Sequence, residues 1–173
     1  MSTLRVNTIQ EADGTAFPFI NYAATNYGNL SNDSDGTTST SYVDTGISQA
    51  ITPSNGSKIL VMVEGGAFGY KPNTDEVSFY INLVATPSGG SSTQLREIQV
   101  RFTAAGSNGT RRLFDSWTIN NMHTHGLDGS TAITYKVQHK LAQGDRIWAA
   151  YRGASIVLLE LKAWANLKSI QSF

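Results

Sequence analysis

Two histidines separated by a single residue are the sharpest candidate for chemistry in this sequence. His123 and His125 lie in the stretch WTINNMHTHGLDG. In an extended segment both imidazoles point to the same side, so they could bind one metal ion, and three copies around a threefold axis would supply six nitrogen ligands. The flanking residues are polar and turn-prone, and His139 falls on a different predicted strand. We therefore predict two loop histidines without a bound metal. Replacing both with alanine should change the free energy of unfolding by no more than about 0.5 kcal/mol.

Other patterns that could carry chemistry are incomplete. The run NDSDG (32–36) lacks the spacing and the terminal glutamate of a calcium-binding loop. The glycine-rich runs GGAFG (65–69) and SGGSS (88–92) have no phosphate-loop lysine and precede no predicted helix. No G-x-S-x-G motif is present, and the acidic residues are too scattered to identify a glycosidase pair. The sequence thus predicts a protein without catalytic residues or a cofactor, one that is not an enzyme.

Composition narrows the classes of partner. The chain has 13 basic and 13 acidic residues and a formal net charge of +0, whereas proteins that bind nucleic acids usually carry a basic surplus. It has no cysteine, which excludes disulfides and thiolate chemistry. No apolar run is long enough to cross a bilayer, and the first residues lack the pattern of a signal peptide. We expect no nucleic-acid partner and no membrane insertion.

Short strands separated by turn signals account for most of the chain. The clearest is TAITYKVQHKL (131–141), in which every second residue from Ile133 to Leu141 is suited to a core. In TQLREIQVRFT (93–103) the alternation changes phase, which predicts a β-bulge near Glu97. Eight or nine such strands follow Tyr42. This number favours an all-β jelly-roll sandwich over an immunoglobulin sandwich, which has about seven strands.

The last predicted strand is apolar on both faces. In ASIVLLELKAW (154–164), Ile156 and Leu158 share one face, and Val157, Leu159 and Leu161 share the other. A sandwich covers only one face of each strand, so the second face predicts a subunit interface around a threefold axis. The candidate interface residues are Tyr135, Val137, Ile156, Leu158 and Leu161.

The N-terminal region is predicted to lie outside the domain. Residues 1–20 form an expected docking arm, residues 21–41 an expected linker, and residues 42–173 the jelly-roll domain. The arm would dock by strand addition and apolar contacts, and a truncated chain that starts near Asn21 should still fold. The arm residues expected to dock are Leu4, Arg5, Val6, Ile9 and Phe17.

The start of the chain also carries a resemblance. STLRVNTIQ, followed by a short polar turn, resembles the N-terminus of small virion proteins of marine and cyanobacterial phages, in which lysine is usual at the position of Arg5. TTSTSYVDTGISQAITPSNGSKILVMV (37–63), TAITYKVQHK and ASIVLLELKA are similar to β-domain segments of that family. The loop HTHGLDGS (123–130) departs from it. The resemblance implies a homotrimeric jelly roll, similar to the tumour-necrosis-factor-like fold, on a phage particle, and it supplies no catalytic residues.

The resemblance leaves two functions open. The first is a head-decoration protein or short head fibre, whose arm binds the coat protein or another virion protein. The second is a tail-fibre or baseplate tip whose loops 70–76, 86–92 and 123–130 bind a host glycan or protein. The chain has no shaft between arm and domain, which favours the first. Both place the protein in the virion, after synthesis in the host cytoplasm.

Overall fold

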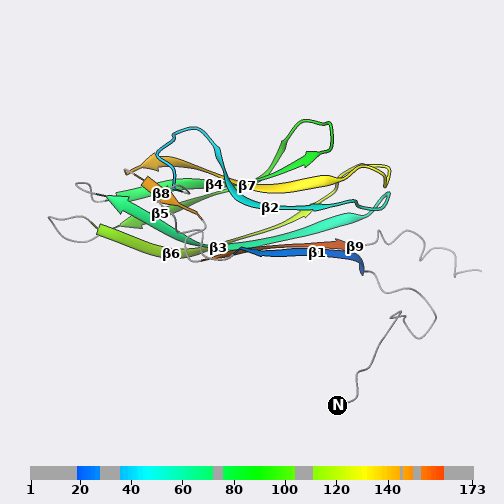
Figure 1. Ribbon diagram of the computed structural model, residues 1–173, viewed down its shortest axis with the longest axis horizontal. Coiled ribbons are helices and arrows are strands. Elements are labelled where there is room, and N and C mark those ends of the chain that lie inside the picture. The colour runs from blue at the N-terminus through cyan, green and yellow to red at the C-terminus, as the bar shows by residue number, and fades with distance from the viewer. Residues whose placement is uncertain are drawn as a thin grey trace, which may run out of the picture.

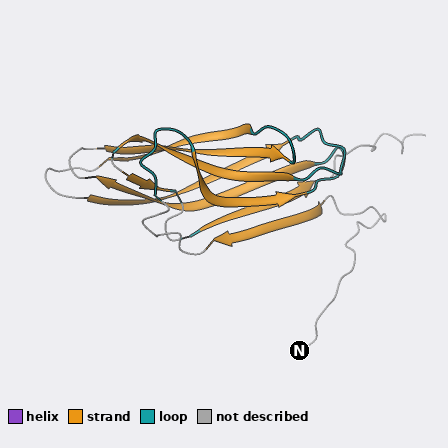
Figure 2. Ribbon diagram, turned by 45° about the horizontal axis from the view of Figure 1, so that its top comes forward, coloured by secondary structure: helices purple, strands orange, loops and turns teal. Residues whose placement is uncertain are grey.

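Antiparallel strands build the whole of the described structure. The computed structural model describes residues 19–27, 36–71, 76–103, 111–144, 146–149 and 153–161. These residues contain nine strands and no helix, and the strands stack in two layers (Figures 1 and 2). The all-β prediction is confirmed. The strands are β1 (Phe19–Tyr27), β2 (Val43–Ile51), β3 (Lys58–Lys71), β4 (Glu76–Pro87), β5 (Thr93–Thr103), β6 (Arg111–His123), β7 (Ile133–Gln143), β8 (Arg146–Trp148) and β9 (Ala154–Leu161).

The strand pairing has the nested order of a jelly roll. β4 pairs with β5 as a hairpin, β3 with β6, β2 with β7, and β1 with β9, so each pair encloses the previous one along the chain. This is a long two-stranded ribbon wound over itself. The winding gives one sheet in the order β1-β9-β3-β6 and a second in the order β2-β7-β4-β5, while short β8 pairs with the far end of β3. The described residues contain no helix that is long and apolar enough to cross a membrane.

The core lies between the two sheets and follows the alternation of the sequence. Along β7 and β9 every second side chain is buried. Apart from Ala154, His139 and Glu160, these inward side chains are branched aliphatic or aromatic, the types that pack well on a pleated surface. The largest fully buried ones are Tyr135, Phe79, Ile47, Ile59, Ile81, Leu83, Ile119, Ile133, Ile147, Ile156, Leu158 and His139.

Two boundaries differ from the sequence prediction. The sequence pattern predicts that Phe19–Tyr27 belong to the arm and the linker, but they form β1. Its backbone pairs with β9 from Phe19↔Leu161 to Tyr27↔Ala154. The domain therefore includes residues well before Tyr42. The loop predicted at residues 123–130 also begins one residue too early, because His123 is the last residue of β6. The expected bulge is present close to Glu97, since the register of β4 with β5 shifts where Leu83 faces Arg96 and Val84 faces Gln94.

Gly65 is required because an indole ring occupies the place of its side chain. A Cβ at this position would lie 2.7 Å from Cζ2 of Trp117 and 2.9 Å from the carbonyl oxygen of Ala149. The ring is held there because its Nε1–H donates to the same carbonyl at 2.7 Å.

We expect Gly65→Ala to lower the free energy of unfolding by about 1 to 3 kcal/mol, the usual effect of overpacking a core. Urea denaturation would measure it. Gly66→Ala is the matched control, because Gly66 lies next along β3 and its side chain would point to the outer face; this change should stay within about 0.5 kcal/mol. Equal losses in the two variants would contradict the explanation.

Candidate functional site: the outer face of the β1-β9-β3-β6 sheet

The outer face of the β1-β9-β3-β6 sheet carries apolar side chains in adjacent rows. Leu60 on β3 lies opposite Leu159 on β9 and Met122 on β6, and Met62 lies opposite Val157. All are partly solvent-accessible, and Met122 is the most exposed of them at 47%. We call this surface the apolar patch; it consists of Leu60, Met62, Met122, Val157, Leu159 and Leu161.

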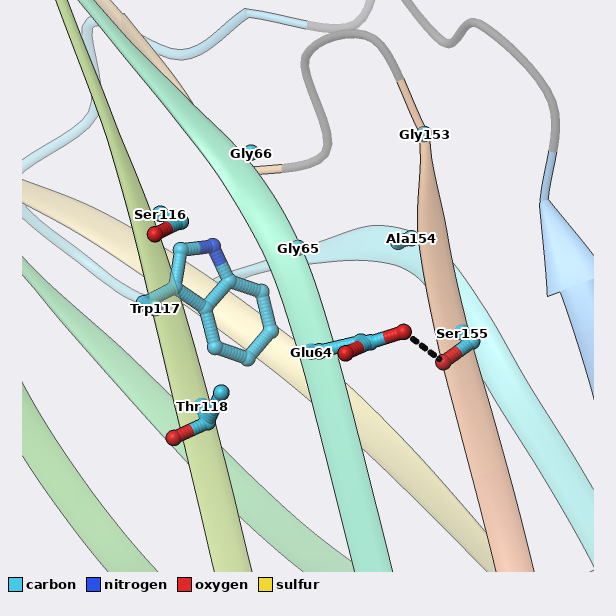
Figure 3. A pocket seen from close by; sticks show the side chains of 9 residues that line it. All are labelled: Glu64, Gly65, Gly66, Ser116, Trp117, Thr118, Gly153, Ala154 and Ser155. Carbon is cyan, nitrogen blue, oxygen red and sulfur yellow. Dashed lines mark hydrogen bonds between the residues drawn. The ribbon is translucent and has the colours of Figure 1, made fainter.

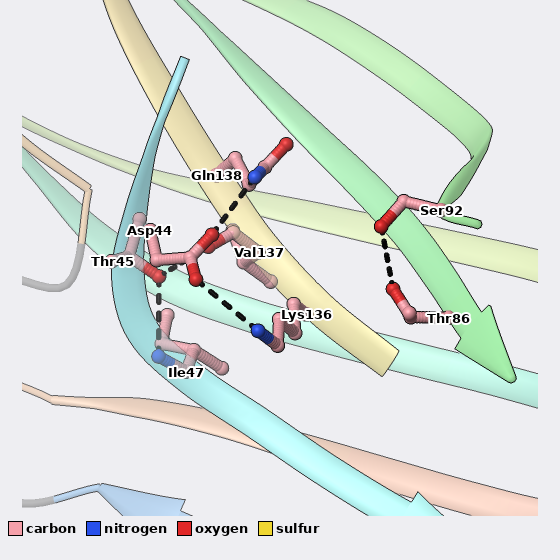
Figure 4. A network of polar contacts seen from close by, with 8 residues as sticks. All are labelled: Asp44, Thr45, Ile47, Thr86, Ser92, Lys136, Val137 and Gln138. Carbon is pink, nitrogen blue, oxygen red and sulfur yellow. Dashed lines mark hydrogen bonds and ion pairs between the residues drawn. The ribbon is translucent and has the colours of Figure 1, made fainter. Parts of the chain in front are cut away.

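The outer face of the other sheet is polar. Asp44 on β2 accepts a hydrogen bond from Gln138 Nε2 at 2.8 Å and forms an ion pair with Lys136 at 3.3 Å, both on β7 (Figure 4). On the same face Lys140 Nζ lies 4.3 Å from the ring centroid of Tyr42. The apolar patch thus distinguishes the outer face of the β1-β9-β3-β6 sheet from the polar outer face of the other sheet. Covering the apolar patch with a partner removes apolar surface from water, which stabilises the assembled state.

The structure separates the five candidate interface residues into two groups. Tyr135, Val137, Ile156 and Leu158 are each 0% exposed in the single chain, because the facing sheet covers them. They belong to the core and leave no surface for a second subunit. Leu161 alone lies in the apolar patch. The prediction of an uncovered apolar face on the last strand holds for Val157, Leu159 and Leu161, which are only half-buried.

A polar depression lies beside the apolar patch. It measures about 510 Å³ and is lined by three neighbouring strands, β6, β3 and β9 (Figure 3). Glu64 on β3 faces Thr118 on β6 and Ser155 on β9 in one cross-strand row. The Ser155 hydroxyl donates to Glu64 Oε1 at 2.9 Å. We call this depression the polar notch. Sequence reasoning missed it because its lining residues come from three distant segments.

His123 and His125 are not free loop residues. His123 Nδ1 lies 2.9 Å from the hydroxyl of buried Tyr135. The backbone N–H of Leu127 donates to His125 Nδ1 at 3.0 Å, so that nitrogen carries no proton, and His125 Nε2 must donate to the Ser57 hydroxyl at 3.1 Å. Both nitrogens of His125 are therefore in use.

Burial lowers the pKa of both histidines. For His123 the neighbouring His125 lowers it further, whereas for His125 the carboxylate of Glu160 partly opposes the shift. No group of three or more metal-binding side chains occurs in the described part of the chain. The absence of a metal remains a prediction.

These contacts change the expected result of substitution. Burial raises the pKa of Tyr135, so its hydroxyl stays protonated and shares one hydrogen bond with His123 Nδ1. His123→Ala would leave a buried hydroxyl without its partner, and we expect a loss of about 1 to 3 kcal/mol rather than a near-neutral change. The test is a double-mutant cycle by urea denaturation. In a Tyr135→Phe background the same substitution should cost clearly less, and equal costs would contradict the account.

His139 is the third histidine and the most buried. It is 2% exposed, its Nδ1 has no hydrogen-bond partner, and desolvation lowers its pKa to about 4. It lies at a cavity of about 320 Å³ where β2 departs from the ladder, at Asp44, Thr45 and Gly46. The alternation of the sequence predicts that His139 lies on the inward face of its strand, but it does not indicate that burial lowers the pKa of this side chain.

The predicted docking residues Leu4, Arg5, Val6, Ile9 and Phe17 lie outside the described residues. Comparison with known proteins adds no assignment: no protein-family model matches the chain, and no curated protein matches it.

Proposed function

We propose that this chain is a non-enzymatic structural protein of a phage virion, a homotrimer that attaches to the particle through its N-terminal arm. Within the particle we assign it to the head, as a decoration protein or short head fibre. The proposal rests on the sequence resemblance together with one structural observation, the apolar patch on an otherwise polar sandwich.

The patch supports self-association for a physical reason. An all-β domain can leave an outer sheet face in water if that face is polar, as the β2-β7-β4-β5 sheet does. Leu60, Met62 and Leu159 on the opposite face are instead of the kind found in the core of homo-oligomer interfaces. A threefold arrangement in which only the patch end of this face meets the axis would bury the patch, leave the polar notch at the open end of the interface, and turn Asp44 and Lys136 to solvent.

The resemblance supports attachment through the arm. Strand addition uses main-chain hydrogen bonds and makes few demands on side chains, which suits a segment with sparse apolar residues such as Leu4, Val6 and Ile9. Residues 1–18 of the arm precede β1, so their removal should leave the paired strands intact.

Deletion of residues 1–18 tests this role. We expect the shortened chain to keep its β-sheet circular dichroism and its oligomeric mass and to lose attachment to particles that lack the protein. Quantitative mass spectrometry of reconstituted particles measures attachment. A copy number comparable to that of the coat protein indicates head decoration, and a small fraction of it indicates a tail position. Undiminished attachment of the shortened chain would refute the docking role.

A further inference from the structure

We propose that the polar notch binds a pyranose ring of a glycan, with Glu64 as the main hydrogen-bond acceptor. This site shares no residue with the arm or with the apolar patch, and the proposal goes beyond the structural role argued above.

The floor of the notch is backbone. Gly66 on β3 faces Ser116 on β6, and its N–H donates to the Gly153 carbonyl at 3.2 Å next to the start of β9. Neither glycine has a side chain, so among the described residues a flat ring can approach these peptide groups closely (Figure 3).

The wall of the notch matches the chemistry of a polyol. A carboxylate offers about four acceptor positions, and the Ser155 hydroxyl uses one of those on Glu64. The hydroxyls of Ser116 and Thr118 can both donate and accept, and the Ser155 hydroxyl, whose hydrogen goes to Glu64, can accept. A sugar presents neighbouring hydroxyls that need both hydrogen-bond donors and hydrogen-bond acceptors. Hydrogen bonds from these hydroxyls to a carboxylate are charge-assisted and therefore stronger than neutral ones.

Other classes of ligand fit less well. A divalent cation needs several oxygen ligands of high charge, and the described lining contains a single carboxylate. An anion would be repelled by Glu64. An aliphatic ligand would remove three hydroxyls and a carboxylate from water without replacing their hydrogen bonds.

The size of the notch suits one sugar unit. Its volume of about 510 Å³ lies within the range of roughly 300 to 1,000 Å³ typical of small-molecule sites. Because the notch is shallow and covers one side of a ring, we expect weak binding of a single sugar. In an oligomer, several notches on one polymeric glycan would raise the apparent affinity.

Saturation-transfer NMR on the full chain tests the proposal. The probes are the methyl pyranosides of glucose, galactose, mannose and N-acetylglucosamine, with glycerol as the polyol control. We expect saturable transfer to at least one pyranoside and none to glycerol. Glu64→Gln should weaken this binding about tenfold, as for loss of one charged hydrogen bond. Gly66→Val should abolish it by filling the notch.

Asp44→Asn is the matched control, because it removes one negative charge from the outer face of the other sheet, away from the notch, and should leave binding unchanged. If Gly66→Val does not fold, Glu64→Gln and Ser155→Ala decide the result. The proposal is overturned if no probe exceeds glycerol, or if the control weakens binding as much as Glu64→Gln does. It is also overturned if Glu64→Gln alters the oligomeric mass while no probe binds, because the notch would then be a contact between copies. Loss of trimerisation or of particle attachment by itself bears only on the proposed function.

Discussion

Leu159→Asp should convert the proposed trimer into folded monomers. Leu159 lies at the centre of the apolar patch, opposite Leu60 on β3. In a single chain the new carboxylate would remain in water, so the fold should survive. In the trimer the same carboxylate would be buried without a partner, which costs several kcal/mol for each subunit. Light scattering should therefore give a mass near that of one chain, 18.7 kDa, where the unaltered protein gives three times as much.

Thr134→Asp is the matched control for this prediction. Thr134 lies on β7, on the polar outer face of the other sheet, and is half-buried like Leu159. This substitution should leave the trimer intact. A monomeric unaltered protein at micromolar concentration would contradict the trimer. A Leu159→Asp protein that remains trimeric would show that the subunits associate through another surface.

Acidification should destabilise the protein by about 3 kcal/mol through His139 alone, because a tenfold change in proton affinity between the folded and unfolded states corresponds to about 1.4 kcal/mol. Burial lowers the pKa of His139 from 6.5 to about 4 in the folded state. Between these two values the unfolded chain binds the proton and the folded chain does not, so the free energy of unfolding falls as the pH falls. The stabilisation is complete above about pH 6.5 and is lost progressively down to about pH 4. The pKa values of His123 and His125 are lowered as well, so both should add to the loss.

Urea denaturation at several pH values between about 7.5 and 4 measures this dependence. His139→Leu removes the titrating group and keeps an apolar side chain at a buried position, so the slope of stability against pH should become shallower. At neutral pH the variant should lose little, because His139 Nδ1 has no hydrogen-bond partner to give up. An unchanged slope in the variant would assign the acid sensitivity to other groups.

The sequence determined those features of the fold that depend on local alternation. Every second residue of 133–141 is apolar or histidine, and the structure buries these residues, because successive side chains of a strand point to opposite faces. The phase change near Glu97 marked the bulge for the same reason. The sequence does not indicate β1, because NYAATNY has few apolar residues. The place of β1 in a sheet depends on β9, which lies more than a hundred residues later in the chain.

Tertiary structure alone decided which apolar surface is covered. In β9 both faces are apolar, so periodicity cannot distinguish the core residues Ile156 and Leu158 from Val157 and Leu159 on the outside. The second sheet makes that choice by packing on one face. The same holds for the sites: Ser57 reaches His125 across 68 positions of sequence, and Glu64 meets Ser155 across 91. A side chain's charge and reactivity depend on neighbours that only the winding of the strands brings together, and these contacts leave no periodic signal in the sequence.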